Sequence, residues 1–179
     1  MKHRFLLGLI VGIILAVLVM VGGTYAYFAG GHAPVATDSK PMPFEKWLAR
    51  TALHARMEKE IPTTVPIEAT EPNLRAGAEL YVEHCAVCHG LPEKSKTAIA
   101  AGMFPRPPQL FHGKGVTDDP PGETYWKVAN GIRLSGMPGF RSTLKDDQLW
   151  QVSLLLAKAD QLPKSVESVL TAKVLPAGK

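Results

Sequence analysis

The sequence predicts an all-α protein in which a small domain of three to four helices follows a transmembrane helix. An uncharged apolar run fills residues 5–23, and apolar residues later recur at the spacing of a helix face. The segments around the two cysteines show none of the alternation that a strand requires. A length of 179 residues, with 46% hydrophobic and 20% charged residues, fits one domain plus an appendage. Two cysteines are too few for a disulfide-based scaffold.

Charge gives little information about partners. The chain has 20 basic and 16 acidic residues, a formal net charge of +4, and they are spread along the sequence rather than grouped. A nucleic-acid-binding surface would require a basic cluster. We therefore expect no nucleic-acid partner.

Residues 1–30 are predicted to form a single membrane anchor. The 19 residues from 5 to 23 would make a helix of about 28 Å, close to the thickness of the hydrocarbon layer. Lys2 and Arg4 precede this run, and the next charged residue is Asp38. The positive-inside rule then leaves the N-terminus in the cytoplasm and places the rest of the chain on the periplasmic side of the cytoplasmic membrane.

A cleavable signal peptide is the alternative interpretation of this segment. Such signals have a shorter apolar region, of about 7–15 residues, and a small-residue cleavage site. Here the run is longer, and the only candidate site, after Ala33, is weak. Tyr25, Tyr27 and Phe28 resemble the aromatic belt of a membrane interface. We therefore favour an uncleaved anchor.

Residues 31–70 are predicted to be a linker. Prolines divide it into short pieces, and only residues 44–60 have helical character, with an incomplete apolar stripe. This short helix is expected either to pack on the neighbouring domain or to lie along the membrane surface. No chemical role is assigned to it.

A compact domain is predicted over residues 71–163. Its first helix begins near Glu71 and has an apolar face that ends on Cys85. Residues 90–121 are expected to be a loop, and residues 123–130 a short helix closed by Gly131. The last helix is predicted to begin with Thr143 as its cap and to end before Pro163. Residues 164–179 are expected to be a polar tail.

Both cysteines fall in the motif Cys85-Ala-Val-Cys88-His89, which is typical of c-type haem attachment. On a helix, positions i, i+3 and i+4 share a face. The two thiols can form thioethers with one edge of a porphyrin, and the His89 imidazole can bind the iron. A zinc site would need further ligands, and a thioredoxin-type pair would follow a strand. We therefore predict one covalently bound haem c.

Met137 is the preferred candidate for the sixth iron ligand. Met103 follows His89 by only 14 residues, too short a chain to reach the opposite face of the ring. His112 lies far enough along the chain but in a polar loop. Met137 lies between Gly136 and Pro138, in a loop whose glycines allow the backbone to approach a flat ligand.

Residues 71–162 resemble a class I c-type cytochrome domain, particularly the single-haem domains of bacterial respiratory cytochromes. The similar segments are GAELYVEHCAVCHG, PRPPQL, ETYWKVANGIRLSGMPGF and DDQLW. The resemblance covers about half of the chain and implies a cytochrome c-like fold around the haem. It also implies that the Pro108 carbonyl accepts a hydrogen bond from Nδ1 of His89, and that Gly77 meets Trp150 where the first and last helices cross. Further neighbours of the haem or its propionates would be Trp126, Arg106 and Arg133.

The predicted function is electron transfer rather than catalysis. An iron bound by His and Met has no vacant position for a substrate, and the thioether raises its potential. The redox partner would be a terminal oxidase, a quinol-oxidising complex or a periplasmic dehydrogenase. The alternative is a gas-sensing or peroxidase-like haem protein, in which the sixth position is open or its ligand is displaceable.

Overall fold

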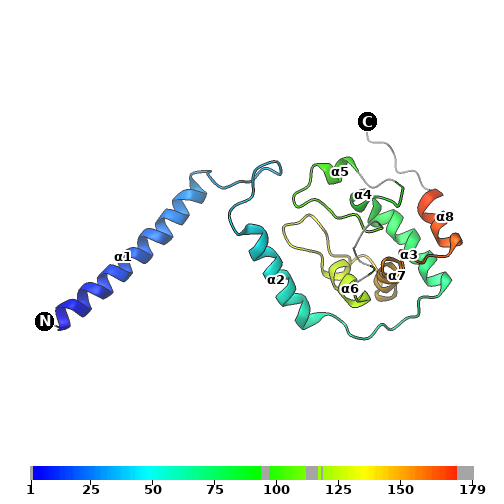
Figure 1. Cartoon of the computed structure of the whole chain (residues 1–179), viewed down its shortest axis with the longest axis horizontal. Coiled ribbons are helices and arrows are strands. Elements are labelled where there is room, and N and C mark those ends of the chain that lie inside the picture. Colours follow the sequence, from blue (N-terminus) through cyan, green and yellow to red (C-terminus); the bar gives the residue numbers. More distant parts are fainter. Residues whose placement is uncertain (1, 94–96, 112–116, 118, 173–179) are drawn as a thin grey trace. The chain divides into compact units, whose positions relative to one another are not determined.

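The computed structural model describes residues 2–93, 97–111, 117 and 119–172, and these residues form helices joined by loops (Figure 1). Within this described part there is no strand, only an isolated bridge between Ile132 and Met137. The all-α prediction is confirmed. The helices are α1 (Lys2–Ala29), α2 (Glu45–Glu60), α3 (Glu71–His84), α4 (Ala86–His89), α5 (Ala98–Ala101), α6 (Pro121–Asn130), α7 (Asp146–Ala157) and α8 (Lys164–Ala172).

The chain divides into two compact units, Met1–Lys46 and Trp47–Lys179. The first unit contains α1, whose described residues are all exposed to solvent. Its length of 28 residues, and a mean hydropathy of 3.0 over an 18-residue window within it, are sufficient for a helix that crosses a membrane. The predicted N-terminal apolar helix is therefore present.

The core of the second unit is built from α3, α6, α7 and α8. Helix α3 crosses α7 at Gly77, where a Cβ atom would lie 2.3 Å from the backbone oxygen of Gln151. Only a residue without a side chain allows this approach. The closest atoms belong to Gln151 and Leu155 rather than to Trp150. Trp150 instead stacks on Tyr125 of α6, with ring centroids 4.2 Å apart.

Helix α2 lies mostly within the second unit. The sequence predicts a linker here with a short helix that either packs on the neighbouring domain or lies along the membrane surface. The side chain of Met57 is 2% exposed, and the Trp126 indole N–H donates to Oε2 of Glu60 over 3.1 Å. The segment that follows α2 also contacts the domain, because a Cβ on Gly122 would lie 2.1 Å from the Pro62 carbonyl oxygen. These contacts join α2 to α6.

The start of α7 differs from the prediction. Thr143 was expected to cap this helix, but its N–H donates to the Phe140 carbonyl, as does that of Leu144, so residues 140–144 form a separate turn. Helix α7 begins three residues later, where the N–H of Lys145 donates to Oε1 of Gln148. The prediction of Thr143 as the cap is therefore wrong.

Two further segments contain more helix than predicted. The expected loop over residues 90–121 includes the short helix α5 and the first residue of α6. The expected polar tail begins instead with α8, whose Val166 and Leu170 are buried in the core cluster beside α3. These two residues are four positions apart and therefore share a helix face. The rest of that tail, residues 173–179, lies outside the described residues, as does the candidate ligand His112.

Candidate functional site

The Cys85–His89 motif consists of Cys85, the residue that joins α3 to α4, and of the single turn of α4. Cys85 ends α3, and its carbonyl accepts hydrogen bonds from the backbone N–H groups of Cys88 and His89, over 3.1 and 2.9 Å. The two thiols and the imidazole therefore keep helical spacing, as predicted from the motif. Both cysteines are partly exposed and neither is in a disulfide.

His89 is oriented by a hydrogen bond from its ring. Nδ1 lies 2.9 Å from the Pro108 carbonyl oxygen, the contact that the cytochrome resemblance implies. A carbonyl oxygen only accepts, so Nδ1 carries the proton and the lone pair of the neutral ring is on Nε2. Burial lowers the pKa of His89, and the bond to Pro108 opposes this effect. The ring is thus kept in the neutral form that binds metals.

Two more hydrogen bonds fix the end of the motif. The Gln109 amide nitrogen donates to the His89 carbonyl over 2.6 Å. The Tyr81 hydroxyl donates to the Gly90 carbonyl over 2.8 Å from inside the core. Gly90 has a positive φ of 79°, which ends α4 and turns the chain away. The imidazole is therefore held by its backbone as well as by its ring.

The thiol of Cys85 is not an activated nucleophile. Burial, followed by the neighbouring charge of Cys88, raises the pKa of Cys85 to about 12. Reactive cysteines that work as enzyme nucleophiles or redox pairs usually have a lowered pKa. The environment of Cys85 therefore does not favour a thioredoxin-type function.

Met137 lies in a short loop that is tied back onto α6. The Met137 carbonyl accepts from the N–H of Ile132 over 3.1 Å, and the Met137 N–H donates to Oγ of Ser135 over 3.2 Å. Gly131 is required here, because a Cβ on it would lie 2.7 Å from the Met137 oxygen. Beyond the loop, the Phe140 N–H donates to the Val128 carbonyl. The half-buried Met137 side chain thus extends from a fixed backbone.

Met103 contacts the Met137 loop, which the sequence did not indicate. A Cβ on Gly136 would lie 2.7 Å from the terminal methyl of Met103. Gly136 has a φ of 80°, so only glycine is unstrained at this position. The segment after α5 therefore reaches the loop that holds Met137, a contact between residues too far apart in the chain for local patterns to predict.

The three predicted haem neighbours have different environments. Trp126 is buried, and its indole N–H is bonded to Glu60. Arg106 and Arg133 are both exposed. Glu60 was missed because only the folded chain brings it to a residue 66 positions later.

The residues present fit haem c. Two free thiols three positions apart precede an imidazole whose Nε2 carries a lone pair. Within the part of the chain that the structure describes, no group of three or more His, Cys, Asp and Glu side chains is arranged to hold a metal ion by itself. The donor chemistry is therefore that of covalent haem attachment rather than of a zinc site.

Comparisons with known proteins agree with this chemistry. Residues 72–154 match the family model described as cytochrome c oxidase, cbb3-type, subunit III. Over 91 residues, half of this chain, the sequence is 28% identical to the quinohemoprotein alcohol dehydrogenase ADH IIB of Pseudomonas putida. The match covers 11% of the length of that protein.

One solved structure is also similar to the chain. It is a reducing HAO-like protein complex of Kuenenia stuttgartiensis, with a TM-score of 0.48 and 22% identity over 68% of this chain and 52% of that chain. The family-model match spans the Cys85–His89 motif, Pro108 and Met137. Cytochrome c domains bind haem c covalently through the Cys-x-x-Cys-His spacing found here. Residues 72–154 of this chain are therefore a c-type cytochrome domain.

Proposed function

We propose that the protein is a membrane-anchored, single-haem electron carrier. Cys85 and Cys88 would hold the haem by thioethers, and His89 and Met137 would be the axial ligands. The observation that carries the proposal is the His89 ring, whose Nδ1 is bonded to the Pro108 carbonyl so that Nε2 is available to iron. Haem bound in this way supplies a one-electron iron couple.

The residues around the site would keep the ligands in place in both oxidation states. The hydrogen bonds from Gln109 and Tyr81 restrain the end of the Cys85–His89 turn. Those at Ile132 and Ser135 restrain the Met137 loop. Ligands that move little make the reorganisation on gain or loss of an electron small, which favours rapid transfer.

The proposed location is supported by the N-terminal segment. Helix α1 is long and apolar enough to span a membrane, and its positive residues, Lys2 and Arg4, lie in its first turn. The positive-inside rule favours a cytoplasmic N-terminus and a periplasmic cytochrome domain. The partner would be a redox protein at the same membrane: a terminal oxidase, a quinol-oxidising complex or a dehydrogenase.

Met137→Ala tests the axial ligand, with Met103→Ala as the matched control. If the Met137 sulfur binds iron, the oxidised protein has the weak long-wavelength charge-transfer band of iron–thioether ligation, and the reduced protein binds carbon monoxide poorly. Met137→Ala should abolish the band, open the iron to carbon monoxide and lower the potential. Met103→Ala should preserve all three properties.

Covalent attachment should survive in both variants, because Cys85, Cys88 and His89 are unchanged. Haem staining after denaturing electrophoresis checks this. If the unmodified protein binds carbon monoxide readily when reduced and lacks the band when oxidised, the carrier assignment is wrong and the gas-sensing or peroxidase-like alternative replaces it. If Met103→Ala alone opens the iron, the ligand is Met103.

A further inference from the structure

One face of helix α2 packs against the cytochrome domain, and the opposite face is exposed to solvent. Met57 is 2% exposed and Glu60 bonds to Trp126, so the C-terminal half of the helix is joined to the cytochrome domain. Trp47 and Leu48, in the N-terminal half, are 64% and 62% exposed. Leu48 precedes Met57 by nine residues, a rotation of about 180° at about 100° per residue, so it lies on the opposite side of the helix.

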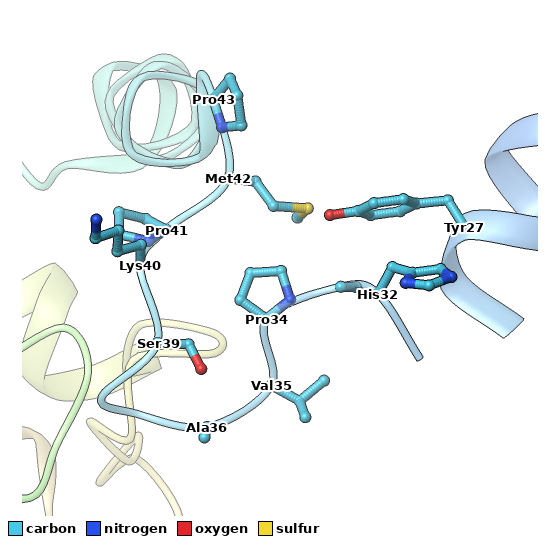
Figure 2. Close-up of a pocket in the computed structure, with 11 residues that line it drawn as sticks. Tyr27, His32, Pro34, Val35, Ala36, Ser39, Lys40, Pro41, Met42 and Pro43 are labelled. Carbon is cyan, nitrogen blue, oxygen red and sulfur yellow. The ribbon is translucent and has the colours of Figure 1, made fainter. Parts of the chain in front are cut away.

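The residues that precede α2 lie beside the end of α1. A pocket within the first unit is lined by Tyr27, from the last turn of α1, and by Met42 and Pro43, which come just before α2. Figure 2 shows the side chains of Met42 and Tyr27 pointing toward each other across it.

Hydrogen bonds hold this segment at both ends. The N–H of His32 donates to the Tyr27 carbonyl over 3.2 Å, and the N–H of Met42 donates to Oε2 of Glu45 over 2.8 Å. These bonds fix the backbone where the link leaves α1 and where it enters α2. Trp47 follows Pro43 by only four residues along the chain, so this short connection limits its distance from the end of the first unit.

We propose that the first turns of α2 dock on the membrane surface, with Trp47 and Leu48 among the lipid headgroups and upper acyl chains. The inference rests on the proposed function, because it requires α1 to be the anchor. Tryptophan favours the membrane interface, where its ring is apolar and its N–H remains hydrated. The exposed Arg50, one turn after Trp47, suits the phosphate groups of an anionic leaflet.

Lipid is the proposed occupant of this face because the membrane anchor, α1, keeps the segment near a bilayer. Once α1 spans the bilayer, the covalent link of residues 30–44 limits how far the start of α2 can lie from the bilayer, whereas a protein partner would have to arrive by diffusion. The other side of α2 is bonded to the cytochrome domain through Glu60 and Trp126. Docking would therefore hold the domain near the membrane and limit its rotation toward partners in that membrane.

Spin labelling of the full-length haem-loaded chain tests this inference. Leu48→Cys is labelled and compared with Glu58→Cys, an exposed position three turns further along α2. Both variants are placed in lipid nanodiscs of phosphatidylcholine and phosphatidylglycerol with no other protein. The label at position 48 should collide more with oxygen and severalfold less with a water-soluble nickel chelate than the label at position 58.

Two results would overturn the inference. If haem absorbance elutes with the discs but both labels meet the nickel chelate equally, α1 is an anchor and α2 does not dock on lipid. This is also the result expected if the face is reserved for a protein partner. If the haem absorbance elutes apart from the discs, the anchor itself is wrong and the inference fails with it.

Discussion

At the scale of single residues, Gly77 sets the distance between α3 and α7. A Cβ at this position would lie 2.3 Å from the Gln151 oxygen, a backbone atom that cannot rotate away. Gly77→Ala should lower the free energy of unfolding by about 1–3 kcal/mol, because the overpacking outweighs the higher helix propensity of alanine. Gly102→Ala is the control, since the nearest atom to its Cβ would be 3.7 Å away. Denaturant unfolding of the haem-loaded protein measures both, and equal losses would contradict this account of the crossing.

Tyr81 makes the free energy of unfolding depend on pH in the alkaline range. Burial, followed by the charge of Cys85, raises the pKa of Tyr81 above its usual value, and its hydroxyl donates to the Gly90 carbonyl. The unfolded chain loses this proton near pH 10 while the folded chain keeps it, so stability is complete below about pH 10 and falls as pH rises above it.

Tyr81→Phe removes both the hydrogen bond and the titrating group. It should cost about 1–2 kcal/mol at pH 8 and make the fall above pH 10 shallower. Tyr125, whose pKa is also raised by burial, should preserve part of the fall. Urea midpoints between pH 8 and pH 11 provide the test, and an unchanged slope in the variant would show that Tyr81 is not the source.

At the scale of helices, α8 is the element whose role the sequence analysis underestimated. Val166 and Leu170 are buried on one face of a helix that follows Pro163. Leu170→Ala should therefore destabilise the protein by about 2–5 kcal/mol, the usual cost of removing a large core side chain. Thr171→Ala, at an exposed neighbouring position, should change stability by less than about 0.5 kcal/mol. A small effect of Leu170→Ala in thermal unfolding would mean that α8 contributes little to the core.

The elements that the sequence predicted well are those with local signals. Proline in the first turn of α3, the apolar face ending on Cys85 and the glycine after α6 are readable within a few residues. The start of α7 was misplaced because the turn over residues 140–144 uses backbone groups that a sequence pattern does not reveal.

The residues through which α2 is attached were beyond local patterns for a different reason. It depends on Glu60 meeting Trp126, which are distant in the chain. The same applies to the contact of Met103 with Gly136. For the candidate site, the motif predicted the turn that holds Cys85, Cys88 and His89, and the resemblance supplied the bond to Pro108. The roles of Met137, Arg106 and Arg133 remain predictions.

At the scale of the whole molecule, the division after Lys46 separates the proposed anchor from the proposed carrier. The first unit contains the apolar helix, and the second contains the cytochrome domain together with most of α2. Electron transfer requires a rigid site, whereas a membrane anchor only has to be long enough to connect the domain to the bilayer. The contacts of Met57 and Glu60 indicate that α2 belongs to the rigid part.

Two shortened chains, each exported behind a cleavable signal, test this division. A chain beginning at Asp38 lacks α1 but retains α2, so it should be recovered in the soluble periplasmic fraction with covalent haem and with the unfolding free energy of the full-length protein. A chain beginning at Glu71 also loses the buried Met57, the Glu60–Trp126 bond and the Pro62 contact with Gly122. It should be less stable by about 3 kcal/mol or more, from the lost side-chain burial and hydrogen bond. Equal stability of the two chains would show that α2 is a linker after all, and membrane retention of the Asp38 chain would show that α1 is not the sole attachment to the membrane.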